Sequence, residues 1–443
     1  MSQERKLKLG LFVQGAGHHT AGWRHPQAQS GSENFELIKQ LAMTAEGAKL
    51  DMIFLADGLT TSADSSPSVV ARFEPITLLA ALTTVTRRIG LAVTASTTYY
   101  DPFNLARLLA SVDQLSQGRA AWNVVTTSTR EAALNFSQTD HLEHSVRYER
   151  AAEFVEVVKG LWDSWEPEPY IVNKQTGEYI DKRKVHELNH KGKYFAVKGP
   201  LNVTQSPQGQ PVIIQAGSSG PGQELAARIG EVVFTAQQTF EDAQVFYSGL
   251  KGLLPKYGRR PEHLHILPGL FPVIGATEKE ARDKYEELQS FIDDTKAYAT
   301  LQERFDYDLR GYSLDGPVPD IPESGGRKSR PQLLMKLARD KGLTLRQLYR
   351  EVAGARGHRI VVGTPIQLAD HIQKWFEGFA ADGFNIMPPY VPGGFEDFVD
   401  GVIPELQNRG LFRTEYEGGT LRENLGLPVP ANRHSTVSTL SNT

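Results

Sequence analysis

Short apolar runs rich in β-branched residues alternate along the chain with segments in which apolar positions recur at helical spacing. Eight runs are predicted to be buried strands, at 7–13, 51–57, 89–97, 120–127, 211–217, 232–236, 266–275 and 383–389. Helices are predicted between them, at 34–48, 75–85, 102–115, 147–163, 223–229, 240–253, 278–291 and 365–380. Strands that alternate with helices are typical of βα units around a parallel sheet. Eight units close a barrel, so the pattern predicts the α/β fold class with a (β/α)8 TIM barrel.

An open doubly wound sheet is the main competing fold. Dinucleotide-binding members of that class carry G-x-G-x-x-G after the first strand. Here the first strand runs into "FVQGAGHHTAGW", which places His18 and His19 side by side instead. The missing glycine motif disfavours both the open sheet and a nicotinamide dehydrogenase.

Two long segments interrupt the alternation, at about 128–210 and 292–355. Insertions of this length in a compact barrel usually serve as lids or active-site loops. We therefore expect one barrel domain over residues 1–430 that carries both insertions. The tail after Gly418 is expected to be extended, and its polar end, residues 431–443, to be disordered.

Composition narrows the functional classes. Among 443 residues, 48 Lys+Arg nearly balance 52 Asp+Glu, and no basic stripe favours a nucleic-acid partner. The absence of cysteine excludes disulfides, thiolate chemistry and cysteine-bound metal. The first apolar run is too short for a signal peptide, and no run approaches the roughly 20 residues that span a bilayer. We expect a cytoplasmic protein with no membrane partner.

Polar residues at the ends of the predicted strands are the first candidates for chemistry, because a barrel carries its active site at the carboxyl ends of its strands. They are Asp57, Thr94, Ser96, Asn123, Ser218 and Ser219. Structural roles stay open for some of them: Asp57 precedes a glycine and suits a turn, and Asn123 suits hydrogen bonding inside the barrel.

The segment "QAGSSGPGQELAARIG" at 215–230 has a strand, a turn rich in glycine and serine, and a helix. This arrangement offers backbone N–H groups and the positive end of a helix to an anion. Ser218 and Ser219 would add hydroxyl donors.

The segment "HLEHSVRYER" precedes the amphipathic helix at 147–163. His144 and Tyr148 continue its apolar stripe backward, so the pattern favours two core residues with satisfied polar tips. A ligand-facing pair above the barrel is the alternative. The histidines lack the i,i+4 spacing of a zinc protease, and no G-x-S-x-G motif supports a hydrolase, so no metal is expected.

The loop after the first strand contains His18, His19, Trp23 and Arg24. It would line a pocket at the barrel mouth with imidazoles, an aromatic wall and a cation. Alternatively, Trp23 plugs the mouth and the other residues are solvated. Arg24 and the basic stretch at 325–330 would suit a carboxylate-bearing substrate, although a solvated surface explains that stretch equally well.

Several segments together resemble one family. They are "FLADGL" (54–59), "RFEPITLLAAL" (72–82), "STTYYDPFNLARLLASVDQLSQGRAAWNVVTT" (96–127), "RYERAAEFVEVVKGLWDSW" (147–165), "HKGKYFAVKGPLN" (190–202), "SPQGQPVIIQAGSSGPG" (206–222) and "GLFRTEYEGGTLRENLGL" (410–427). The chain resembles the nitrilotriacetate, EDTA and dibenzothiophene-sulfone monooxygenases, a branch of the bacterial luciferase-like enzymes. This resemblance covers nearly the whole chain.

The resemblance implies a luciferase-type TIM barrel that uses FMN, as FMNH2 delivered by a separate NAD(P)H:flavin reductase, together with O2. It implies FMN binding by Asp57, Thr94, His144, Tyr148 and Ser218, and it places Asn123 near the flavin. Tyr148 and Ser218 would reach the phosphate. The resemblance thus favours the site role of His144 and Tyr148.

The implied reaction proceeds through a flavin C4a-(hydro)peroxide and oxidises a small amine or organosulfur compound, by N- or S-dealkylation or C–S cleavage. His144, His18 or His19 would exchange a proton, and the sequence does not choose among them. A deazaflavin-dependent oxidoreductase and a non-catalytic flavin-binding protein are the alternatives. The resemblance also implies a homodimer or homotetramer.

Overall fold

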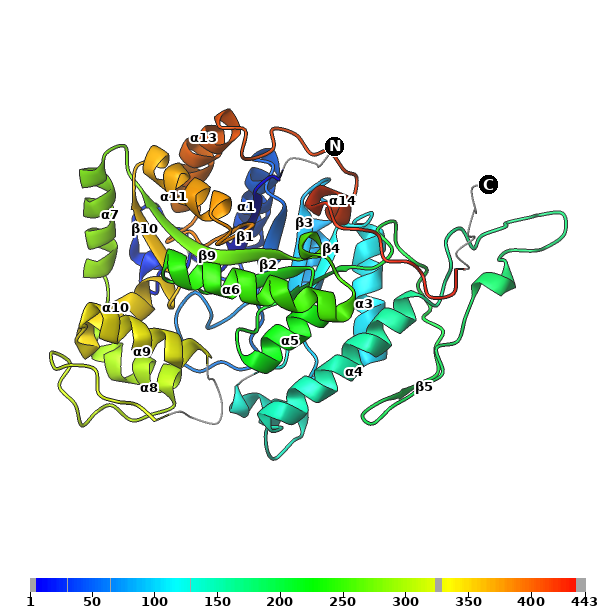
Figure 1. Cartoon of the computed structure of the whole chain (residues 1–443), viewed down its shortest axis with the longest axis horizontal. Helices are drawn as coiled ribbons and strands as arrows, with labels where there is room; N and C mark the ends of the chain where they lie inside the picture. Colours follow the sequence, from blue (N-terminus) through cyan, green and yellow to red (C-terminus); the bar gives the residue numbers. More distant parts are fainter. Residues whose placement is uncertain (1–4, 30, 64, 128, 323–328, 436–443) are drawn as a thin grey trace.

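The computed structural model describes residues 5–435 except 30, 64, 128 and 323–328. Its centre is a closed barrel of eight strands, each parallel to its neighbours (Figure 1). In order around the barrel, they are β1 (Lys8–Val13), β2 (Met52–Leu55), β3 (Gly90–Ser96), β4 (Ala120–Val125), β7 (Val212–Gln215), β8 (Val232–Thr235), β9 (His265–Ile274) and β11 (Gly383–Ile386). These are the eight strands predicted from the apolar runs, and the predicted TIM barrel is confirmed.

One further strand, β10 (Arg359–Gly363), was not predicted. It pairs in parallel with the second half of β9, from Leu270 onward, outside the ring of eight. Four of its five residues are only half-buried or exposed. Its apolar run, residues 360–362, is only three residues long and follows the polar residues His358 and Arg359, so it is a weak strand signal.

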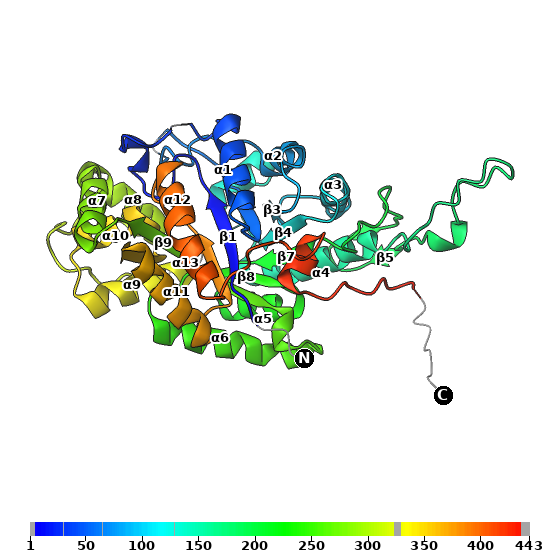
Figure 2. The ribbon, with the colours of Figure 1, turned by 90° about the horizontal axis from the view of Figure 1, so that it is seen from above.

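Helices surround the barrel and follow its strands (Figure 2). They are α1 (Phe35–Gly47), α2 (Pro75–Leu82), α3 (Pro102–Leu115), α4 (His144–Trp162), α5 (Gly220–Ile229), α6 (Phe240–Leu253), α7 (Glu278–Ser290) and α11 (Pro365–Glu377). Most begin at a side chain that accepts a hydrogen bond from a backbone N–H of the first turn, as Asn34, Asp101 and Thr239 do.

The segment 128–210 is only partly an insertion, because α4 takes the place of the fourth barrel helix. Trp162 of α4 donates from Nε1 to the carbonyl of Ala106 in α3 over 3.0 Å. On the other side, Glu156 lies 3.8 Å from Arg228 of α5. After α4, an arm at 163–201 with the hairpin β5 (His190–Lys191) and β6 (Ala196–Val197) extends away from the barrel (Figures 1 and 2).

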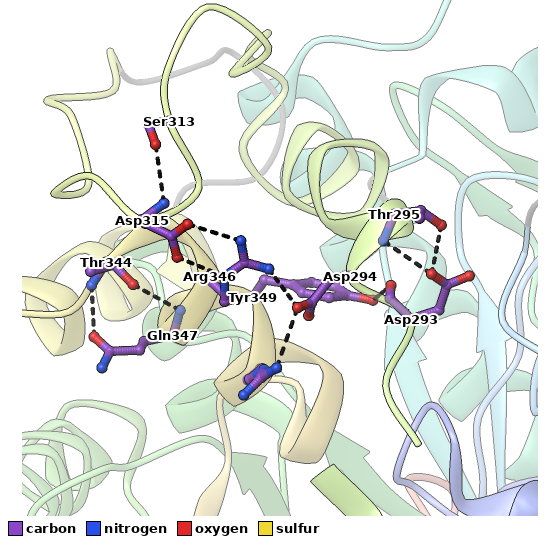
Figure 3. Close-up of polar contacts among 10 residues, drawn as sticks. Asp293, Asp294, Thr295, Ser313, Asp315, Thr344, Arg346, Gln347 and Tyr349 are labelled. Atoms are coloured by element: carbon purple, nitrogen blue, oxygen red, sulfur yellow. Dashed lines mark hydrogen bonds and ion pairs between the residues drawn. The ribbon is translucent and has the colours of Figure 1, made fainter. Parts of the chain in front are cut away.

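The second segment, 292–355, forms a helical cap with a core of its own. It consists of α8 (Ala297–Phe305), α9 (Ser329–Lys341) and α10 (Leu345–Ala355). Arg346 joins its parts by donating to Asp315 over 2.7 Å and to Asp294 over 2.5 Å (Figure 3). Tyr349 donates to the carbonyl of Asp293, so α10 is fixed to the start of the segment.

The amino-terminal end of the barrel is closed by α14 (Leu421–Leu425), where an extended tail was predicted. That prediction is wrong because Thr420 and Glu423 cap this short helix reciprocally. Leu421 lies against Gly90, where a β-carbon would be 2.5 Å from it. Two further helices, α12 (Gly393–Asp397) and α13 (Ile403–Asn408), also went unpredicted.

The polar tail was predicted to be disordered from residue 431. Asn432, however, is buried and donates to the carbonyls of Asp163 and Trp165, so the prediction does not hold at this position. Residues 436–443 lie outside the described part of the chain. In the part that is described, no helix is long and apolar enough to cross a membrane.

Candidate active site at the barrel mouth

The carboxyl ends of β3 and β4 place two polar side chains together. Thr94 and Asn123 are register partners and both are almost fully buried. Nδ2 of Asn123 donates to Oγ1 of Thr94 over 2.9 Å. Oδ1 of Asn123 has no hydrogen-bond partner among the described residues. A buried acceptor without a partner is costly, so this oxygen suits an N–H donor of a ligand.

The loop between β7 and α5 presents hydrogen-bond donors. Ser219 caps α5 and accepts a hydrogen bond from the N–H of Gly222 over 3.3 Å. Oγ of Ser218 lies 3.4 Å from Oγ1 of Thr235 at the end of β8. The strand, turn and helix predicted for 215–230 are confirmed, and the start of this ten-residue helix suits an anion such as phosphate.

His144 and Tyr148 lie on the first turns of α4, with ring centroids 4.8 Å apart. Both are half-buried. The ring of Tyr148 packs against the core, but its hydroxyl reaches the β7–α5 loop, where a β-carbon on Gly217 would lie 3.2 Å from it. The ring of Tyr148 therefore belongs to the core, whereas its hydroxyl lies at the β7–α5 loop.

A cavity of about 690 Å³ opens beside this loop. It lies between the β7–α5 loop, the β8–α6 loop and α9 of the cap. Its polar lining includes His144, Ser218, Ser219, Gln237, Asp242, Lys336 and Arg359. Small-molecule sites commonly have a volume of roughly 300–1,000 Å³, so the cavity can hold a cofactor-sized ligand.

Asp57 follows β2 and is half-buried. Its Oδ1 accepts a hydrogen bond from the N–H of Gly58 over 2.7 Å, as in the predicted turn. Burial raises the pKa of Asp57, while that hydrogen bond and the charge of Arg72 act in the opposite sense. A β-carbon on Gly58 would lie 3.2 Å from Nη2 of Arg72, so the two charged groups are neighbours at this edge of the mouth.

His18 and His19 are completely buried beneath the mouth. Nε2 of His18 donates to the carbonyl of Phe12 over 2.8 Å. Burial lowers the pKa of His18 to about 3 and that of His19 to about 4. Both rings are therefore neutral near pH 7, and Nδ1 of His18 is a buried acceptor that has no partner in the described part of the chain.

The structure does not bring Trp23 and Arg24 to the cavity. Arg24 donates from Nη1 to the carbonyl of Phe291 over 2.7 Å, and its guanidinium lies over the Phe291 ring. Trp23 is 45% exposed, and neither residue lines the cavity. Of the basic stretch 325–330, residues 325–328 lie outside the described residues, but Arg330 does reach the mouth.

Two residues of the mouth, Arg356 and His358, were missed in the sequence. Together with Arg330, the last residue of the predicted basic stretch 325–330, they form what we call the arginine cluster. His358 is buried, and its ring stacks on Phe234 with centroids 5.1 Å apart. Phe234 in turn meets Phe12 and Phe54 inside the barrel, so these aromatic rings form an apolar floor. The only sequence signal was "GARGHRIVVG", which includes the unpredicted strand β10.

Sequence comparison assigns the chain to a family. The sequence model described as luciferase-like monooxygenase matches residues 12–382. The chain belongs to the luciferase-like monooxygenase family. It is a flavin-dependent monooxygenase, and both the family and the enzyme class predicted from the sequence are confirmed.

Two relatives of this luciferase-like chain are similar over nearly their whole length. N-acetyl-S-(2-succino)cysteine monooxygenase of Bacillus subtilis (strain 168) is 56% identical, over 98% of this chain and 99% of that protein. Nitrilotriacetate monooxygenase component A of Aminobacter aminovorans is 48% identical, again over 98% and 99% of the two chains.

Two solved structures confirm the fold. Long-chain alkane monooxygenase, known from a crystal structure, is 34% identical in sequence to this chain, with a TM-score of 0.84 over 96% of each chain. The structure of riboflavin lyase with modified FMN and riboflavin is 32% identical, also with a TM-score of 0.84 over 96% of each chain.

Proposed function

We propose that this luciferase-like chain uses FMNH2 and O2 to oxidise a small organosulfur compound, specifically a thioether. Bound FMNH2 would supply two electrons, so that one oxygen atom enters the substrate and the other leaves as water. The observation that carries this proposal is the 56% identity, over 98% of the chain, to an enzyme named for an S-substituted cysteine.

The residues of the mouth fit FMN. Backbone N–H groups at the start of α5, with the hydroxyls of Ser218, Ser219 and Tyr148, would hold the phosphate. Oδ1 of Asn123, which has no partner in the described structure, would accept an N–H of the flavin ring beside Thr94. Asp57 and His144 would complete the cofactor site. Phosphate sites in TIM barrels more often follow the seventh and eighth strands, whereas this one would follow the fifth, β7.

The protein would protect the oxygen chemistry by excluding water. The floor of Phe12, Phe54 and Phe234 offers no proton donor, and the cap covers one side of the cavity. Among the three candidate histidines, we assign the proton exchange to His144. It is half-buried and lines the cavity, whereas His18 and His19 are enclosed and neutral.

A separate NAD(P)H:flavin reductase would supply FMNH2. This proposal is supported by the relative named as component A, since such a name implies a second component. The chain itself has no G-x-G-x-x-G after its first strand, the motif with which many reductases bind a dinucleotide.

Cofactor binding tests the site. FMN binding is measured by titration, from the quenching of FMN fluorescence. The Kd should rise about tenfold in Ser218→Ala and in Tyr148→Phe, because each variant lacks one hydroxyl that would donate to the charged FMN phosphate. Ser290→Ala removes an exposed serine hydroxyl of α7 and should leave the Kd unchanged. Equal affinity in all four proteins would refute the phosphate site, and tighter binding of a deazaflavin than of FMN would refute the cofactor.

A further inference from the structure

The arginine cluster joins the cap to the barrel at the mouth. Arg330 of α9 donates from Nη2 to Nε2 of His358 over 3.2 Å and from Nη1 to the carbonyl of Arg356 over 3.1 Å. Arg356, which ends α10, donates from Nη1 to Oε1 of Gln14 over 2.9 Å. Because Gln14 directly follows β1, the cap places two guanidinium groups at the carboxyl end of a barrel strand.

Positive charge is concentrated here. The pKa of Arg356 is lowered to about 9, first by burial and then by the charges of Arg304 and Arg72, with Arg330 adding to the effect. Glu303 acts in the opposite sense. Like charges so close together are unfavourable, and an anion bound among them would relieve the repulsion.

Two side chains that accept from the arginines each keep a buried donor group as well. A guanidinium can only donate, so Nε2 of His358 is an acceptor. Burial holds the pKa of His358 well below its usual value, and the neutral ring therefore carries its proton on Nδ1. That Nδ1–H and the Nε2 amide group of Gln14 have no partner among the described residues.

Glycine at position 269 fixes the orientation of the His358 ring. A β-carbon on Gly269, in strand β9, would come within 2.2 Å of Nδ1 of His358, so this nitrogen lies against the strand and Nε2 is turned toward Arg330. With Phe234 stacked on its face, the ring is held at the top of the barrel interior. His358 is thus a buried acceptor, 4% exposed, that positions the guanidinium of Arg330.

We propose that Arg330 and Arg356, positioned by His358 and Gln14, bind a carboxylate group of the substrate. Arginine presents paired N–H groups that match the two oxygens of a carboxylate. This inference deepens the proposed function and rests on it: the substrate would be an anionic thioether, with its carboxylate at the cap and its sulfur above the aromatic floor.

The flavin phosphate offers the same anionic chemistry and is the competing occupant. The β7–α5 loop already provides hydroxyls and a helix start for that phosphate, so the cluster is left to the substrate. Measuring affinities for FMN and for a carboxylate in the same variants separates the two sources.

Succinate binding to the FMN-loaded protein, measured by calorimetry, tests the cluster without turnover. Arg356→Gln and Arg330→Gln should each weaken succinate binding about 10- to 100-fold while the Kd for FMN stays constant. Arg282→Gln removes an exposed guanidinium on α7 and should change neither affinity. Arg356→Lys keeps the positive charge but loses the paired N–H groups, so its affinity for succinate should lie between those of wild type and Arg356→Gln.

Two outcomes would overturn the proposal. Succinate affinity that is equal in wild type and in folded Arg356→Gln and Arg330→Gln excludes a carboxylate site. A raised Kd for FMN with unchanged succinate binding assigns the cluster to the flavin phosphate. A melting temperature close to that of wild type confirms that each variant is folded.

Turnover provides a second test of the carboxylate site. With a carboxylate-bearing thioether and its methyl ester as paired substrates, Arg356→Gln should lower kcat/KM for the acid about 10- to 100-fold and leave that for the ester within about threefold. Equal losses for acid and ester would contradict the proposal. If no thioether is oxidised by any of the proteins, the proposed function fails, while succinate binding still decides the role of the cluster.

Discussion

Burial determines what each histidine at the mouth can do. His18, His19 and His358 are enclosed, and burial keeps their rings neutral, so they act as fixed donors or acceptors. His144 is half-buried on the cavity wall and is open to a ligand. Residues of the same type in one mouth therefore take different roles according to their exposure.

His18 should make the protein less stable in acid. Its folded pKa is about 3, and its unfolded pKa is about 6.5. Between these values the unfolded chain binds more protons, so the free energy of unfolding is lost as the pH falls below about 6.5. From pH 7 to pH 5 this histidine should cost about 2 kcal/mol. Urea unfolding at pH 7 and pH 5 gives the free energy of unfolding at each pH. Between these pH values, His18→Phe should lose about 2 kcal/mol less of it than wild type, and an equal loss in the two proteins would contradict the low pKa of His18.

Among the elements, α14 shows how a short helix at the chain's far end completes the barrel. Leu421 and Leu425 join the interior core with Phe12 and Met52, and Arg422 pairs with Glu231. His265, the first residue of β9, donates from Nε2 to the carbonyl of Leu425. The helix thus seals the end of the barrel opposite the mouth.

Truncation at this position should be costly. Leu421→Ala leaves a cavity between α14 and Gly90, and we expect it to lower the free energy of unfolding by about 2–5 kcal/mol. Leu115→Ala, at the 63% exposed end of α3, should change it by less than about 0.5 kcal/mol. Denaturant unfolding measures both, and a small effect of Leu421→Ala would show that the barrel does not need this seal.

The elements also show what the sequence predicts and what it does not. The central strands are buried on both faces, so their apolar runs mark them without ambiguity. The edge strand β10 and the five-residue α14 have too little periodicity, although the capping pair Thr420 and Glu423 was a readable sign.

The same reasoning applies to the site. Thr94 and Asn123 were predictable because parallel strands bring their carboxyl ends together. The arginine cluster was not, because Arg330, Arg356 and Gln14 meet only once the cap has folded onto β1. The apolar and polar pattern within each segment does not predict such a tertiary contact.

As a whole, the molecule consists of a barrel, a cap and an arm. The barrel supplies a rigid mouth with an apolar floor, the cap contributes α9 and its cations, and the arm at 163–201 extends away from both (Figures 1 and 2). In the proposed arrangement, the ends of the barrel strands, the β7–α5 loop and the start of α4 would hold the cofactor, and Arg330 and Arg356 of the cap would bind the substrate carboxylate. Relatives with different substrates are expected to differ chiefly in the cap.

The most direct test of the proposed oxidation is a coupled assay. The purified chain is mixed with a separate flavin reductase, NADH and FMN, and loss of N-acetyl-S-(2-succino)cysteine is followed by mass spectrometry. We predict consumption that requires FMN and O2 together and approaches one thioether per NADH. NADH oxidation that yields only hydrogen peroxide, or thioether loss that persists without oxygen, would contradict a monooxygenase acting on this class of substrate.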